Sequence, residues 1–214
     1  MDAQDVHERQ EAPWEAIAPS AQPYGDGWPA PKAMDSADIS AVVERFRAET
    51  VRARTAGFKV IDIYAGDGFL LHQFCSPLSN LRDDEYGGDF NNRIRLSLQV
   101  VDAIRSEWPT DLTLMFRISA VDWVDDGWGI EDTIELSKQL KYHGVDVIDC
   151  TSDGIGGPYK PNRMPLGQGF QVPFAEQVKE HAAVKTMAVG FIWDPTIANQ
   201  IVADGRADFV ALAR

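Results

Sequence analysis

Residues 58–88 read FKVIDIYAGDGFLLHQFCSPLSNLRDDEYGG, and the rest of the chain is interpreted outward from them. The stretch begins with a short apolar run, residues 60–64, which predicts a buried strand. A glycine-containing turn, residues 65–68, leads into a long segment rich in Ser, Pro, Asn and Asp that ends in Gly87-Gly88. Loops of this length are unusual inside a compact domain and tend to carry function, so this segment is the first candidate for a site.

The composition limits the classes of protein that the chain can belong to. Of the 214 residues, 44% are hydrophobic and 25% are charged, which is typical of one globular domain with a sizeable core. A net charge of −13 and a pI near 4.6 argue against nucleic acid or an anionic membrane surface as a partner. The chain has only two cysteines and no apolar run near the ~20 residues of a membrane span. Its acidic N-terminus does not resemble a signal peptide. These features predict a cytoplasmic protein.

Two parts of the chain are expected to differ in how regular their structure is. Residues 1–34 contain five prolines and are expected to form an irregular lead-in, whereas residues 35–214 are expected to form the folded domain. Asp35 or Ser36 is the expected N-cap of a helix that ends at Gly57. After that helix, strands are predicted over residues 60–64, 112–118, 145–150, 186–189 and 209–212, and helices over 91–108, 130–143, 172–181 and 195–203. This alternation predicts parallel βαβ units, in either an open doubly wound sheet or part of a (β/α)8 barrel.

Four short motifs in and after the opening stretch resemble one family. Leu70-Leu71-His72-Gln73-Phe74, Ser76 to Asn80, Asp84 to Gly88 and Asn92-Arg93 are similar to the segment that follows the fourth barrel strand of the Old Yellow Enzyme family. The resemblance is greatest to the NADPH dehydrogenase-type branch of its flavin-dependent ene-reductases. The lead-in piece IAPSAQPYGDGWPAPKAM also resembles the family's loop before that strand.

The resemblance implies an α/β fold that is an incomplete (β/α)8 TIM barrel. The chain from about residue 12 matches the family's strands four to eight, and strands one to three are missing from it. A whole barrel usually takes about 250 residues. Open sheet edges and an uncovered barrel interior are aggregation liabilities, so we expect the chain to be insoluble or a homo-oligomer.

FMN is the cofactor that the resemblance implies, with NAD(P)H as the hydride donor. Arg117 corresponds to the family's arginine that lies against the flavin ring. Thr151-Ser152 corresponds to a strand-end stretch of the family. Gly190 and Arg214 correspond to its phosphate site. The residues alone leave other interpretations open. Arg117 could instead pair with Asp62 or Asp149, and Thr151-Ser152 could be a structural turn.

Three positions depart from the family's pattern. Tyr64 and Asp67 stand where the family has two histidines that bind the substrate carbonyl, and Phe69 stands where it has a proton-donating tyrosine. An ionised Asp67 only accepts hydrogen bonds, and Phe69 donates none. Reduction of activated alkenes, the family's reaction on small-molecule substrates, is therefore expected to be impaired.

Three interpretations of function follow from these residues and the resemblance. The first is an FMN-dependent NAD(P)H oxidoreductase. The second is an inactive barrel fragment or pseudo-enzyme that pairs with another chain, and the third is part of a longer relative with altered substrates. His72, flanked by Leu70, Leu71 and Phe74, is interpreted as a hydrogen-bonded packing histidine, and the histidines show no metal-ligand spacing.

Overall fold

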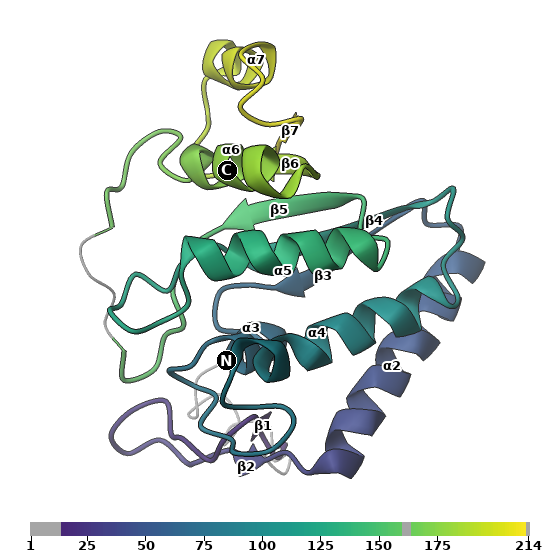
Figure 1. Ribbon diagram of the computed structural model, residues 1–214, viewed down its shortest axis with the longest axis vertical. Coiled ribbons are helices and arrows are strands. Elements are labelled where there is room, and N and C mark those ends of the chain that lie inside the picture. The colour runs from purple at the N-terminus through teal and green to yellow at the C-terminus, as the bar shows by residue number, and fades with distance from the viewer. Residues whose placement is uncertain (1–13, 160–163, 213–214) are drawn as a thin grey trace, which may run out of the picture.

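The computed structural model describes residues 14–159 and 164–212 (Figure 1). The lead-in contributes two short strands that pair in parallel, β1 (Ile17–Ala18) and β2 (Lys32–Ala33). The main sheet consists of β3 (Val60–Ala65), β4 (Thr113–Ser119), β5 (Val147–Thr151), β6 (Lys185–Ala188) and β7 (Phe209–Val210). The helices are α2 (Ser36–Thr55), α3 (Leu70–Cys75), α4 (Phe90–Arg105), α5 (Ile130–Tyr142), α6 (Val172–Ala182) and α7 (Pro195–Ala203).

The topology distinguishes between the two architectures that the sequence left open. The five strands are parallel and lie in the order β3-β4-β5-β6-β7, so every strand pairs with the next one along the chain. Helices α4, α5 and α6 pack side by side along one face of this sheet (Figure 1). A doubly wound sheet carries helices on both faces, whereas a (β/α)8 barrel carries them outside a sequential ring of strands. The sheet is therefore part of a barrel wall.

The two faces of the sheet differ in burial. Side chains that point toward the helices form the core, among them Ile63, Leu114, Phe116, Ile118 and Ile148. On the opposite face, strand register places one residue of each strand in a line: Tyr64, Arg117, Asp149, Met187 and Phe209. This line, called the inner-face row below, lies on the surface that would face the interior of a complete barrel.

Local sequence explains where the helices begin. The Asp35 side chain accepts hydrogen bonds from the backbone N–H groups of Ala37 and Asp38 at 2.8 and 2.9 Å, so the predicted cap of the first long helix is confirmed. Asp89 caps α4 in the same way by accepting from the Asn92 N–H. Such caps typically stabilise a helix by about 1 kcal/mol, because they satisfy backbone donors that have no partner within the helix.

Two details of the sequence prediction were wrong. The segment after residue 68, predicted as a loop, contains the short helix α3, which forms because Leu71 and Phe74 bury their side chains against the core. Helix α4 ends at Arg105 and not at Trp108. The Trp108 ring is instead buried beside the start of β4, where its Nε1 donates to the Thr113 carbonyl at 3.1 Å. Within the described residues, no helix is both long and apolar enough to cross a bilayer.

Candidate functional site

The three residues at the family's catalytic positions lie together at the carboxyl end of β3. Tyr64 is the penultimate residue of the strand, Asp67 lies in the following turn, and Phe69 is the residue before α3. The Tyr64 hydroxyl donates a hydrogen bond to Asp67 Oδ2, and the rings of Tyr64 and Phe69 meet edge to face with centroids 4.8 Å apart. Burial, and then the hydrogen bond to Asp67, raise the pKa of Tyr64 above its ordinary value of 10.0. The only phenol in this group is therefore a weaker acid than a free tyrosine.

The turn that carries Asp67 is fixed by close contacts with the neighbouring strands. Asp67 has a φ of 52°, and its N–H donates to Ser119 Oγ at 2.8 Å, while that hydroxyl donates to Asp67 Oδ1 at 3.3 Å. A Cβ at Gly66 would lie 3.0 Å from Thr151 Cγ2, and one at Gly68 would lie 2.8 Å from the Ile155 carbonyl oxygen. Both glycines are needed for the backbone to approach these neighbours. The Asp67 carboxylate is thus held in place and accepts two hydroxyl hydrogen bonds.

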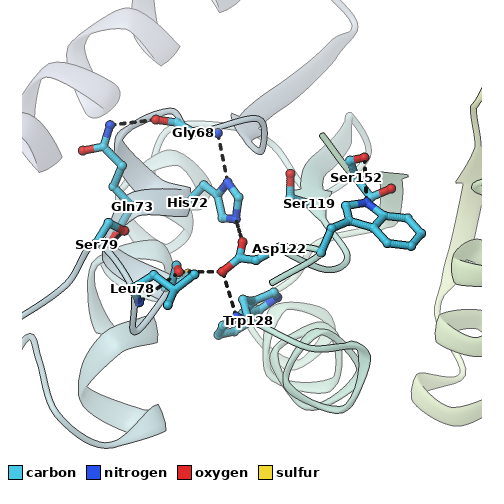
Figure 2. A network of polar contacts seen from close by, with 12 residues as sticks. Gly68, His72, Gln73, Leu78, Ser79, Ser119, Asp122, Trp128 and Ser152 are labelled. Atoms are coloured by element: carbon cyan, nitrogen blue, oxygen red, sulfur yellow. Dashed lines mark hydrogen bonds and ion pairs between the residues drawn. The ribbon is translucent and has the colours of Figure 1, made fainter. Parts of the chain in front are cut away.

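A buried polar network supports this turn from below (Figure 2). His72 Nδ1 accepts a hydrogen bond from the Gly68 N–H at 3.0 Å, so the imidazole proton lies on Nε2, which donates to Asp122 Oδ1 at 2.8 Å. The other oxygen of Asp122 accepts from Ser76 Oγ at 2.6 Å and from the Trp128 N–H at 2.8 Å. His72 and Asp122 are both almost fully buried. The prediction that His72 is a hydrogen-bonded packing residue is confirmed.

The central part of the inner-face row is an ion pair. Arg117 Nη1 donates to Asp149 Oδ2 at 2.7 Å, and the Arg117 guanidinium carbon lies 5.4 Å from the centre of the Tyr64 ring. Of the two partners that the sequence left open for Arg117, the structure therefore has Asp149. Burial raises the pKa of the Asp149 carboxyl although Arg117 opposes the shift. The pKa of Asp62, one inner-face step away, is raised to about 6 by lost hydration and by the charge of Asp149, again against Arg117.

The ion pair leaves two polar atoms for a further ligand. Arg117 Nε and Asp149 Oδ1 are buried and have no hydrogen-bond partner among the described residues. Arg117 and Asp149, which pair across neighbouring strands, thus each keep one buried polar atom without a partner, and such burial is costly. The polar edge of a flavin ring carries both acceptors and an N–H donor, so these two residues fit the part of FMN that the sequence assigned to Arg117.

Two of the other predicted cofactor residues, Ser152 and Gly190, both contact a glutamine that the sequence did not indicate. Gln171 Nε2 donates to the hydroxyl and to the carbonyl oxygen of Ser152, at 3.0 and 3.1 Å. A Cβ at Gly190, which has a φ of 107°, would lie 3.0 Å from both the backbone N and the Cβ of Gln171. Thr151 is buried at the end of β5, and Arg214 lies outside the described residues. Ser152 is thus hydrogen-bonded to Gln171 and Gly190 packs against it, and the role of these residues at a phosphate stays a prediction.

Ser119, Asp122 and Gln171 are the site residues that sequence reasoning did not assign a role. Ser119 ends β4, where a polar residue at the carboxyl end of a parallel strand was a usable signal. Asp122 and Gln171 lie outside regular strands and match no spacing rule. Only the contacts between distant segments identify them.

Comparison with known proteins agrees with this geometry. Residues 2–214 match the sequence profile described as the NADH:flavin oxidoreductase / NADH oxidase family. The chain is 43% identical over 206 residues to an NADPH dehydrogenase of Geobacillus thermodenitrificans, covering 96% of this chain and 59% of that protein. It is 40% identical over 198 residues to an NADPH dehydrogenase of Bacillus subtilis, with 92% and 57% covered.

The fold shows the same partial coverage. A structure of morphinone reductase in complex with tetrahydroNAD superimposes with a TM-score of 0.74 at 24% identity, over 94% of this chain and 56% of that one. The chain thus spans less than two thirds of the relatives that it matches, and the predicted incomplete barrel is confirmed. The predicted relationship to the Old Yellow Enzyme family is confirmed as well: the chain belongs to the NADH:flavin oxidoreductase / NADH oxidase family.

Proposed function

We propose that this chain supplies the strand-four-to-eight part of an FMN-dependent NAD(P)H oxidoreductase that acts on small molecules in the cytoplasm, and that its step on activated alkenes is impaired. The observation that carries the proposal is the pair Arg117–Asp149. In a chain of this family, it keeps a buried donor and a buried acceptor that have no partner among the described residues. When bound, FMN would accept a hydride from NAD(P)H and pass it to an acceptor.

The residues of the chain divide into those that would bind the cofactor and those that would face a substrate. Arg117 would hold the polar edge of the ring and place positive charge beside it, and Gly190 with Arg214 would bind the phosphate, since glycine allows close approach and arginine binds phosphate in a fork. Tyr64 is the one substrate-facing donor of the three, and its hydroxyl already donates to Asp67. A carbonyl oxygen that gains negative charge would meet the Asp67 carboxylate and the apolar Phe69 ring, neither of which stabilises it.

The test supplies the part of the barrel that this chain does not contain. The region carrying strands one to three of an active family member is fused ahead of residue 12, and FMN binding is measured by quenching of flavin fluorescence. We expect the fusion to bind FMN and its flavin to be bleached by NADPH, and Arg117→Ala to weaken FMN binding at least tenfold. Arg52→Ala, which removes an exposed arginine of α2 outside the inner face, is the control. A fusion that folds and melts cooperatively but binds no FMN would rule out the proposal.

A second candidate function is favoured by the exposure of the inner face. Val60, Tyr64 and Phe209 are each between 45% and 47% exposed, and β3 and β7 form the open edges of the sheet. In this second candidate the chain has no redox activity. We propose that the inner face then binds a partner chain carrying parallel strands, or a second copy of this chain. Light scattering after size-exclusion chromatography tests this candidate. Self-association that is lost when Val60→Lys is introduced would support binding of a second copy, and a monodisperse monomer with a sharp melt would contradict binding of a second copy.

A further inference from the structure

A cavity of about 380 Å3 lies between the lead-in segment and the loop that follows β5. Its walls come from residues 14–31 and 155–159, from Gln73 of α3 and from Ser79, and none of its lining residues belongs to the inner-face row. Small-molecule sites usually have volumes of about 300–1,000 Å3. The cavity is therefore large enough for a small organic ligand.

The described lining is suited to an uncharged ligand. None of the described residues that line the cavity is charged, although 25% of the whole chain is charged. An ionised group that entered it would lose hydration without meeting an opposite charge. The described part of the lining therefore favours an uncharged ligand.

The lining favours a flat ring. Trp14, Tyr24 and Trp28 are 84%, 60% and 50% exposed, and all three border the cavity. The rings of Tyr24 and Trp28 lie 5.4 Å apart at 60° to each other, which leaves aromatic surface free for a third ring. Large aromatic side chains gathered at one place on a surface mark a site where apolar area is covered by something else.

The walls are already fixed relative to one another. Gln22 Nε2 donates to the Tyr159 hydroxyl at 2.8 Å, and this hydroxyl donates to the Leu78 carbonyl at 2.6 Å, so these two polar side chains of the wall are already hydrogen-bonded. Gly156 has a φ of 71°, and a Cβ there would lie 3.3 Å from Tyr24 Cε2, so the backbone packs directly on that ring. A ligand would bind without having to order the walls, which lowers the cost of binding.

We propose that this cavity binds an uncharged aromatic molecule of one or two fused rings. It borders the turn of the candidate site, because Gln73 Nε2 donates to the Gly68 carbonyl at 2.7 Å and the Ile155 carbonyl packs on Gly68. A bound ring is thus held next to the turn that carries Asp67 and Phe69. The proposal does not depend on FMN or on the proposed redox activity.

The test uses two probes that differ by one charge, with no flavin or nicotinamide present. Coumarin is a neutral pair of fused rings, and coumarin-3-carboxylate adds a carboxylate to the same rings. Saturation-transfer NMR is recorded on the chain with each probe over a range of concentrations. We expect coumarin to bind and coumarin-3-carboxylate to bind at least tenfold more weakly. No transfer to coumarin, or equal affinity for the two probes, would overturn the proposal.

Three variants locate the bound probe. Trp28→Ala removes one aromatic wall and should weaken coumarin binding by roughly five- to tenfold, and Ala16→Phe, which fills the cavity from an exposed position, should abolish it. Trp193→Ala removes a tryptophan that is 67% exposed but lies away from the cavity, and it should leave binding unchanged. Far-UV circular dichroism identical to that of the parent shows that each variant is folded. Coumarin binding that survives both cavity changes, or that is lost with Trp193→Ala, would show that the probe binds elsewhere.

Discussion

The two faces of the main sheet have the same strands and opposite environments. On the face covered by helices, Leu114, Phe116 and Ile148 are 0% exposed, whereas on the inner face Tyr64 and Phe209 are 45% and 46% exposed. The covered face buries mostly apolar side chains, with Thr186 among them, and the inner face holds Asp62, Arg117 and Asp149. The difference shows that the two faces of the same strands have different roles. The helix-covered face stabilises the chain, and the inner face carries the groups that a ligand or a partner would meet.

The largest effect is expected for residues of the inner face, and it concerns the rate of the reaction and not the stability of the fold. In the fusion described above, the triple change Tyr64→His, Asp67→His and Phe69→Tyr should speed reoxidation of reduced flavin by 2-cyclohexenone by about 10⁴-fold or more, because it restores carbonyl donors and a proton donor together. Each single change should recover far less, since the groups act as a unit. Anaerobic stopped-flow absorbance measures both half-reactions.

The parent fusion is the control for that experiment, because its reduction by NADPH should equal that of the triple variant. Prompt reoxidation by the enone in the parent would contradict the prediction. It would show that Tyr64 and Asp67, hydrogen-bonded to each other, already serve as carbonyl donors.

The second effect compares one residue type on the two faces. Phe116→Ala leaves a cavity under the helices and should lower the free energy of unfolding by about 3–5 kcal/mol, enough to unfold a domain of marginal stability. Phe209→Ala, on the inner face at an open edge, should lower it by less than about 1 kcal/mol. Urea unfolding followed by circular dichroism gives both values. Equal losses would mean that the inner face is covered in solution, for example by a second copy of the chain.

The smallest effect is electrostatic and concerns Asp62. Its pKa is raised from 3.8 to about 6, so the folded state binds more protons than the unfolded state between these values, and stability falls as pH rises through this window. Asp62→Asn removes the charge and should raise stability at pH 7.5 by at most about 1 kcal/mol, because solvent screens a partly exposed group. At pH 5.0 the gain should be smaller.

Urea unfolding at the two pH values tests this prediction, with Asp111→Asn on an exposed turn as the matched control. A gain from Asp62→Asn that is equal at both pH values, or larger at pH 5.0, would show that the Asp62 carboxyl has an ordinary pKa in the folded chain.

Several features could be read from the sequence because they depend on short stretches of chain. Apolar periodicity located all five strands of the main sheet to within two or three residues at each end, and Asp35 marked the start of the first long helix by its capping chemistry. The motifs at Leu70–Phe74 and Asp84–Gly88 identified the family. The substitutions Tyr64, Asp67 and Phe69 were visible because they interrupt a contiguous pattern.

Other features were decided only by tertiary structure, because they depend on which distant segments meet. Strand register aligned Arg117 with Asp149 and so selected this ion pair over one with Asp62. The turn at Asp67 is fixed by Ser119, which is 52 positions further along the chain, and Asp122 fixes it through His72. The helix at Leu70–Cys75 also depends on tertiary packing, since six residues are too few for an isolated helix to be stable. Sequence thus determined the strands of the main sheet and the long helices, whereas packing determined the short helix α3 and which side chains act together.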